Sequence, residues 1–157
     1  MKKLLLIRHA KAAHQDGMKD FERPLTHSGI QDATTMAGRL HINGHIPQII
    51  VTSPALRTKT TANIFTEHLS LPAAHTDKLI YEATEDNLLD IIAGLPDQYS
   101  FIALVGHNPG IAQILHYLTG RIKDVPTCTT AIIDFEAHEW KAISSNTGNL
   151  VYYDEPK

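Results

Sequence analysis

The stretch Leu4-Leu5-Leu6-Ile7-Arg8-His9, close to the start of the chain, decides the fold. The apolar run Lys3–Ile7 shows no polar alternation, which is typical of a central strand covered by helices on both faces. Arg8 and His9 then place a cation and an imidazole where that strand ends. The polar segment from Ala10 to Arg23 has no helical period and is predicted to be a loop.

Strand-like and helix-like segments alternate along the rest of the chain. The other predicted strands are Ile49–Val51, Phe101–Val105, Ala131–Phe135, Trp140–Ser144 and Leu150–Tyr153, with a shorter extended piece at Lys78–Tyr81. The predicted helices carry apolar stripes over Ile30–Leu40, Ala55–Leu69, Leu88–Ile92 and Ile111–Leu118. Thr26 or Ser28 is expected to cap the first of these helices. This order predicts an α/β fold, in which a single three-layer domain over residues 1–157 has a central, mostly parallel sheet flanked by helices.

The composition fits one core and excludes several classes of function. Of the 157 residues, 43% are hydrophobic, which is enough for one core but not for two. The 14 Lys and Arg against 17 Asp and Glu give a net charge of −3, so the chain lacks the basic excess of a nucleic-acid-binding protein. No apolar run approaches the roughly 20 residues that a membrane-spanning helix needs.

The N-terminus and the single cysteine bear on the compartment. Arg8-His9 interrupts the first apolar run, which makes it too short for an export signal. Cys128 has no second cysteine with which to form an internal disulfide. We therefore expect a cytoplasmic protein that acts neither on nucleic acid nor at a membrane.

Polar groups from three separate segments are expected to meet at one edge of the sheet, because the carboxyl ends of parallel strands carry the functional loops of such folds. Arg8-His9 follows the first strand, His107 follows Phe101–Val105, and Arg57 begins the helix after Ile49–Val51. Guanidinium groups and helix N-terminal amides bind phosphate oxygens, and an imidazole can attack phosphorus without a metal. The residues by themselves thus predict a site for a dianionic phosphoryl group.

Four motifs, in order along the chain, resemble those of a known family. They are Leu5-Leu6-Ile7-Arg8-His9-Ala10-Lys11-Ala12, Glu22-Arg23-Pro24-Leu25-Thr26-x-x-Gly29, Thr52-Ser53-Pro54-x-x-Arg57-x-x-x-Thr61-Ala62 and Val105-Gly106-His107-Asn108-Pro109-Gly110. The chain is similar to the histidine phosphatase superfamily, also called phosphoglycerate-mutase-like, and within it to the short SixA-type phosphohistidine phosphatases. Ala10-Lys11 replaces the Gly-Glu of many mutases and sugar phosphatases, which argues against a mutase.

The resemblance implies a role for each matching residue. His9 is expected to be the nucleophile that becomes phosphorylated, while Arg8, Arg57 and His107 hold the phosphoryl oxygens and stabilise charge during transfer. Positioning and electrostatic stabilisation provide most of the catalysis in phosphoryl transfer, so a pocket of fixed cationic donors is the expected design. A charged His107 needs the phosphate as its partner near neutral pH, which makes its role sensitive to pH.

The same resemblance implies a proton donor for the leaving group from the segment before a middle helix. Glu82 is the candidate. Glu85 and Asp86 are close alternatives, although acidic residues at a helix N-terminus also interact favourably with the helix dipole and need no catalytic role.

Two further residues are candidates for substrate binding. Arg23 belongs to the Arg-Pro-Leu-Thr motif and is expected either to bring a fourth cation near the phosphate or to form a surface ion pair with Asp20 or Glu22. Asn108 follows His107 in the fourth motif and is expected to contact the substrate.

These observations predict a metal-independent phosphatase without a cofactor, acting through a phosphohistidine intermediate on a phosphorylated protein. A phosphatase of the same family that acts on a small phosphoester is one alternative, and a module that binds phosphate without chemistry is another. The chain has 10 histidines, so a metal-dependent hydrolase is a third hypothesis, but none of them forms a His-Glu-x-x-His motif.

Overall fold

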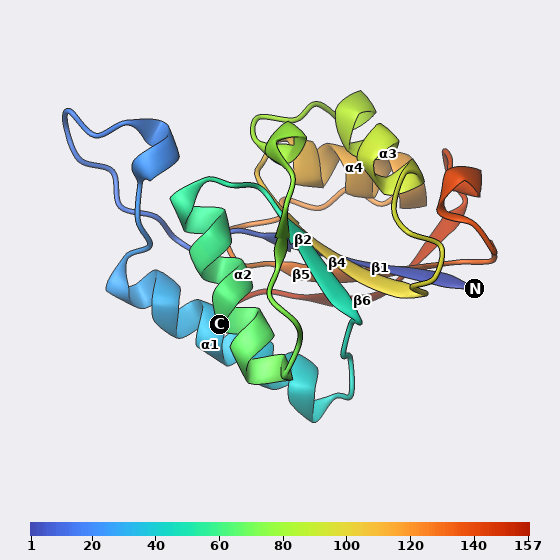
Figure 1. The fold of residues 1–157 in the computed structure, drawn as a ribbon, viewed down its shortest axis with the longest axis horizontal. Coiled ribbons are helices and arrows are strands. Elements are labelled where there is room, and N and C mark those ends of the chain that lie inside the picture. The colour runs from blue at the N-terminus through green and yellow to red at the C-terminus, as the bar shows by residue number, and fades with distance from the viewer.

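The computed structural model describes all residues, 1–157, and places one sheet between two pairs of helices (Figure 1). The strands are β1 (Lys2–Arg8), β2 (Ile49–Thr52), β3 (His75–Thr76), β4 (Phe101–Gly106), β5 (Thr130–Phe135) and β6 (Gly148–Asp154). The helices are α1 (His27–Ile42), α2 (Leu56–Leu69), α3 (Glu85–Ala93) and α4 (Gly110–Thr119). Short 3₁₀ helices are η1 (Asp20–Glu22), η2 (Lys78–Ile80) and η3 (Trp140–Ala142).

The six strands have the order β3-β2-β4-β1-β5-β6. β1 pairs in parallel with β4, and β2 pairs in parallel with β4 and β3. β5 and β6 are antiparallel to their neighbours and form the other half of the sheet. The predicted mostly parallel sheet is therefore confirmed, and its parallel half carries the loops with the candidate residues.

Side chains of β1 alternate between the two hydrophobic layers. Leu4 and Leu6 belong to the core under α3 and α4, whereas Leu5 and Ile7 belong to the core under α1 and α2. All four side chains are at most 1% exposed, and burying such a side chain stabilises the fold by about 1.5–3 kcal/mol. This two-sided burial explains why the strand has no polar alternation, and it confirms the predicted three-layer fold.

Register brings three loops to one edge of the sheet. Arg8 lies opposite Gly106 across the β1–β4 pair, and Thr52 lies opposite Val105 across the β2–β4 pair. The residues that follow these strands therefore start at the same level. His9, His107 and the start of α2 emerge together, as the alternation of strands and helices predicts.

Two local predictions were wrong. The segment Trp140–Ser144 is no strand, because the Trp140 indole is buried, its backbone N–H donates to the Asp97 carboxylate and its Nε1 donates to the Tyr99 carbonyl. These bonds curl the chain into η3. Lys78–Tyr81 also curls, because the Asp77 side chain accepts from the Leu79 amide and caps η2. In both segments backbone N–H groups donate to local carbonyls or to side chains such as those of Asp77 and Asp97, and not to a neighbouring strand.

The loop after β1 is hydrogen-bonded to the segment that begins α1, and we call this contact between Lys11–Ala12 and Leu25–Gly29 the latch. Thr26 caps α1 by accepting from the Gly29 amide, and the Thr26 amide donates to the Lys11 carbonyl at 2.9 Å. Ala12 and Leu25 add an isolated antiparallel bridge. A Cβ on Gly29 would meet the Lys11 carbonyl oxygen at less than any permitted contact distance. The glycine of the second motif is thus required for close approach of two backbones.

Gly29→Ala is expected to destabilise the protein by about 1–3 kcal/mol, because the added methyl group overlaps fixed backbone rather than a side chain. Gly38→Ala is the matched control, since Gly38 lies in the same helix and a Cβ there meets nothing within 4 Å. That change should stabilise the protein by about 0.5–1 kcal/mol through helix propensity. Urea unfolding measures both, and equal effects would contradict the latch.

Candidate active site

His9 lies just beyond the end of β1, and the backbone sets the orientation of its ring. The residue is 7% exposed, and its Nδ1 lies 2.7 Å from the Ala10 carbonyl oxygen. A carbonyl only accepts, so Nδ1 carries the proton and Nε2 keeps its lone pair. The Ala10 amide donates to Thr61 Oγ1 at 3.0 Å, and the Thr61 hydroxyl donates to the Arg57 carbonyl at 2.8 Å. The helix α2 thereby holds the peptide that orients the imidazole.

His107 faces His9, with 5.4 Å between the ring centroids. Its Nδ1 lies 3.3 Å from Arg57 Nη2, and its Nε2 lies 2.8 Å from Ser53 Oγ. A guanidinium group only donates, so Nδ1 is the acceptor and the neutral ring carries its proton on Nε2, donated to Ser53. The two imidazoles therefore hold opposite tautomers, and Nδ1 of His107 is the atom that can take up a proton when an anion binds.

Both arginines of the site have a hydrogen-bond donor without a partner. Arg8 donates from Nη1 to the Val125 carbonyl at 3.1 Å, and Arg57 donates from Nη1 and Nη2 to Asp20. The Nε atoms of Arg8 and Arg57 are buried without a partner. A buried donor without a partner costs about 1–3 kcal/mol, so this pair of N–H groups favours an added acceptor. An oxyanion supplies such acceptors.

Burial, together with the neighbouring cations, lowers the pKa of both imidazoles and keeps them neutral at physiological pH. Burial lowers the pKa of His9 to about 4, and the charges of Arg57 and Arg8 add to this, although the hydrogen bond to Ala10 opposes it. Burial, then the charges of Arg57 and His9, lower the pKa of His107 to about 3. Neutral imidazole is the form with a free lone pair on one nitrogen, and a bound dianion would offset the surrounding positive charge.

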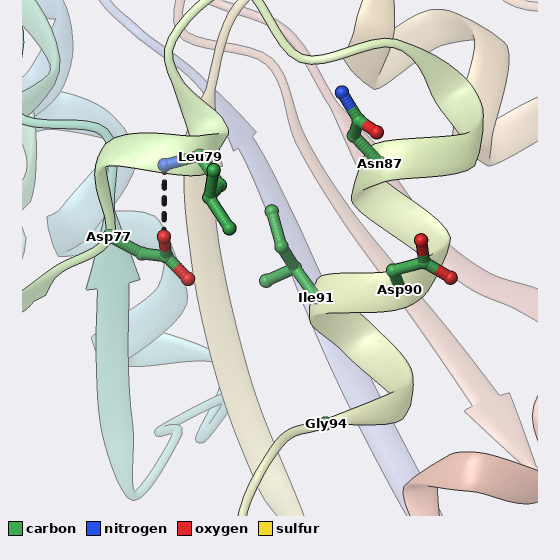
Figure 2. Close-up of a pocket in the computed structure, with 6 residues that line it drawn as sticks. All are labelled: Asp77, Leu79, Asn87, Asp90, Ile91 and Gly94. Atoms are coloured by element: carbon green, nitrogen blue, oxygen red, sulfur yellow. Dashed lines mark hydrogen bonds between the residues drawn. The ribbon is translucent and has the colours of Figure 1, made fainter.

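An open cavity of about 560 Å³ borders Arg57 and His107, whereas Arg8 and His9 are not among the residues that line it. It is lined by Asp20, Arg57, Glu82, Ala83, Thr84, His107, Asn108, Pro109 and Gln113. A separate cavity of about 310 Å³ lies between η2 and α3, and Figure 2 shows its lining residues, Asp77, Leu79, Asn87, Asp90, Ile91 and Gly94. That second cavity has two carboxylates and no cationic side chain, so of these two cavities the first suits a phosphoryl group.

Glu82 lines the cavity beside Arg57 and His107, whereas Glu85 and Asp86 are not among its lining residues. The Glu82 side chain is exposed, and its backbone has a φ of 56°. The chain passes so close to the start of α4 here that a Cβ on Gly110 would lie 2.7 Å from the Ala83 carbonyl oxygen. The structure therefore brings Glu82, and not the two alternatives, to the cavity.

Arg23 contacts Asp20, which lines the cavity, but does not line the cavity itself. It donates from Nε to the Ala13 carbonyl at 2.8 Å and from Nη1 to the Asp20 carboxylate at 3.2 Å. The surface ion pair expected as one alternative is therefore present, with Asp20 rather than Glu22 as partner. The charge of Arg23 nevertheless contributes to the lowered pKa of His9.

Asn108 lines the cavity, but both ends of its amide are engaged within the protein. Nδ2 donates to the Val125 carbonyl at 2.9 Å, and Oδ1 accepts from the Ala112 amide at 3.2 Å. Val125 also accepts from Arg8, so Asn108 braces the carbonyl that holds this arginine. Direct contact between Asn108 and a substrate stays a prediction.

Sequence reasoning missed four residues that organise the site. Ser53 and Thr61 belong to the third motif, but the motif does not indicate which polar atom each of them contacts. The sequence predicts Asp20 only as a partner of Arg23, and it gives no signal for Tyr81. The signal for Asp20 is the spacing Asp20-x-x-Arg23 in a polar loop, and an ordinary surface ion pair has the same spacing.

The remaining histidines do not assemble into a second centre. No group of three or more His, Cys, Asp or Glu side chains is arranged so that it could hold a metal ion. None of the helices combines the length and the apolar character needed to cross a membrane. The cytoplasmic location stays a prediction.

Residues 4–83, just over half of the chain, match the family described as the histidine phosphatase superfamily (branch 1). The chain belongs to this superfamily and is a phosphatase, as its four motifs predicted. An uncharacterised chloroplast protein of Arabidopsis thaliana is 28% identical over 159 residues, which cover 94% of this chain and 72% of the relative. An uncharacterised protein of Mycobacterium tuberculosis H37Rv is 28% identical over 162 residues, covering 96% of this chain and 100% of the relative.

Solved structures place the chain with the SixA-type branch. A structure assigned as phosphohistidine phosphatase SixA from Agrobacterium tumefaciens has a TM-score of 0.84 and 25% identity, over 99% of this chain and 98% of the other. A protein histidine phosphatase SixA complexed with tungstate has a TM-score of 0.85 and 19% identity, over 98% and 97%. The mycobacterial glucosyl-3-phosphoglycerate phosphatase shares the fold, with a TM-score of 0.69 and 14% identity over 96% and 97%.

The lowered pKa values of His9 and His107 predict a pH dependence of stability. The unfolded imidazoles take up protons near pH 6.5, whereas the folded ones do so only near pH 4 and 3. The unfolded state binds more protons in this window, so the free energy of unfolding falls as the pH drops below 6.5 towards 4. His9→Gln and His107→Gln should each flatten this slope in urea unfolding, while His41→Gln, at an exposed position, should leave it unchanged. A slope that is as steep in both site variants as in the wild type would contradict the lowered pKa values.

Proposed function

We propose that this protein is a metal-independent phosphatase that works through a covalent phosphohistidine intermediate at His9 and removes phosphate from phosphohistidine on a protein partner. The observation that carries the proposal is the hydrogen bond from His9 Nδ1 to the Ala10 carbonyl. It leaves the Nε2 lone pair without a proton, and the two arginines whose Nε–H groups lack partners are near enough for their charges to lower the pKa of His9. This arrangement provides a nucleophile and charge stabilisation without a metal.

In the first step, Nε2 of His9 attacks phosphorus, and the bond from phosphorus to the leaving group breaks as the P–N bond forms. Arg8, Arg57 and His107 hold the phosphoryl oxygens, with His107 Nδ1 taking up a proton as the dianion binds. Glu82 donates its proton to the leaving group. In the second step, water attacks phosphorus, the deprotonated Glu82 accepts the water proton, and the P–N bond breaks to release inorganic phosphate and neutral His9.

A phosphohistidine substrate is supported by the open cavity and by the resemblance to the SixA structures. An imidazole is easily expelled once protonated, so a single exposed carboxyl group at the cavity wall suffices as its proton donor. The tungstate bound by one SixA neighbour is an oxyanion of the kind that the unpartnered arginine donors suit. The cavity also accommodates a small phosphoester, and the mycobacterial neighbour is named as a phosphatase of glucosyl-3-phosphoglycerate.

Hydrolysis of p-nitrophenyl phosphate with and without EDTA tests the chemistry. We expect activity that resists the chelator, that His9→Ala abolishes, and that His41→Ala retains. A quenched reaction should contain a phosphoenzyme that is labile in acid and stable in base. Loss of activity in EDTA would favour a metal-dependent hydrolase, and full activity of His9→Ala would overturn the proposed nucleophile. Phosphate binding without hydrolysis of either this ester or a phosphohistidine peptide would indicate a binding module.

The proton-donor role of Glu82 predicts an effect that depends on the leaving group. Glu82→Gln should slow hydrolysis of an alkyl phosphate, a poor leaving group, by about 10²–10⁴-fold, and slow p-nitrophenyl phosphate much less. Asp86→Asn removes a nearby exposed charge outside the cavity and is the matched control. Equal losses on both substrates would count against general-acid catalysis.

A further inference from the structure

We infer that Asp20 is a positioning residue for Arg57, and that Tyr81 holds Asp20 in place. The inference rests on the proposed function, because its consequences are read out in phosphate binding and turnover. A carboxylate in a site for a dianion is the opposite of what charge alone would select.

Asp20 contacts one edge of the Arg57 guanidinium. Its backbone carbonyl accepts from Nη1 at 2.7 Å, and its Oδ2 accepts from Nη2 at 3.1 Å. A guanidinium group presents one fork at Nη1 and Nη2 and another at Nε and Nη2. Asp20 occupies the first fork. The second fork is left with a buried, unpartnered Nε and with the Nη2 donor that faces His107 Nδ1.

The second fork of Arg57 is therefore the edge left for a phosphoryl oxygen. An oxyanion that accepts from Nε and Nη2 replaces the contact of Arg57 with His107, and a protonated His107 Nδ1 can then donate to the same anion. Asp20 keeps both of its bonds to Arg57 throughout. The Arg57 side chain is 7% exposed, so its long stem is already packed, and Asp20 fixes the rotation of the charged end.

Tyr81 and Arg23 hold the Asp20 carboxylate in turn. The Tyr81 hydroxyl donates to Oδ2 at 2.6 Å, and Arg23 Nη1 donates to Oδ1 at 3.2 Å. These hydrogen bonds, that of Tyr81 foremost, lower the pKa of Asp20, so the carboxylate stays ionised. The Tyr81 ring also packs edge-on against Phe21 and His107, at centroid distances of 5.1 Å and 5.5 Å. The half-exposed Asp20 side chain thus joins η1, η2 and α2 across the cavity mouth.

Asp20 could instead compete with phosphate for Arg57, in which case a phosphate would have to displace it. The two roles differ in the sign of one measurement. Removing a competitor tightens phosphate binding, whereas removing a positioning group weakens it. The unpartnered Nε atoms of Arg8 and Arg57 favour positioning, because a competing carboxylate would satisfy them.

The test measures the inhibition constant of inorganic phosphate, together with kcat and KM for p-nitrophenyl phosphate, in Asp20→Asn and Tyr81→Phe. We expect the phosphate constant to rise about tenfold in Asp20→Asn and somewhat less in Tyr81→Phe, with KM following it. The double variant should bind phosphate no more weakly than Asp20→Asn alone, because Tyr81 acts through Asp20. Glu22→Gln, an exposed charge in the same turn, should change nothing.

A merely structural role lowers the amount of active enzyme, and hence kcat, but leaves KM and the phosphate constant unchanged. That result, tighter phosphate binding in Asp20→Asn, or additive effects in the double variant would each overturn the inference while the wild type stays active. A wild type that neither hydrolyses the ester nor binds phosphate would overturn the proposed function as well. If Asp20→Asn does not fold, Tyr81→Phe decides, since it removes a single hydroxyl group at the rim.

Discussion

Parallel pairing of β1 with β4, and of β4 with β2, is the constraint on which the site depends. Arg8 lies opposite Gly106 and Thr52 opposite Val105, so the loops that carry His9, His107 and Arg57 leave the sheet at one level. A slip by one residue would move the β1 side chains to the opposite faces, because side chains alternate along a strand. Leu4 and Leu6 pack in one hydrophobic layer and Leu5 and Ile7 in the other, and this sorting therefore also fixes the position of His9, the proposed nucleophile.

Concentrating positive charge at this edge has an energetic cost that the protein limits in two ways. Both imidazoles stay neutral, since burial and the neighbouring guanidinium groups lower the pKa of His9 and of His107. Asp20 adds a carboxylate beside Arg57 without occupying its Nε. The site thus keeps unpartnered cationic donors close to two neutral imidazoles. Fixed cationic donors and a neutral imidazole together suit the phosphoryl transfer through histidine that we propose.

Much of the fold could be predicted from the sequence, because its signals are local and strong. The unbroken apolar run of β1 and the capping Thr26 both have direct structural counterparts. The predictions that failed were short segments with mixed patterns. Trp140–Ser144 reads as a strand, but burial of one indole and two hydrogen bonds to the Asp97–Tyr99 segment decide its shape. No pattern within five residues carries information about a partner roughly forty positions away.

The residue types of the site, and the strand ends on which Arg8, His9 and His107 lie, were determined by the sequence alone, because motif and periodicity are properties of neighbouring residues. Tertiary structure alone decided which atoms meet. The Ala10 carbonyl sets the tautomer of His9, Ser53 and Arg57 set that of His107, and Asp20 turns Arg57. Those choices depend on angles and distances between segments up to 54 residues apart, which the packing of helices on both faces of the sheet fixes.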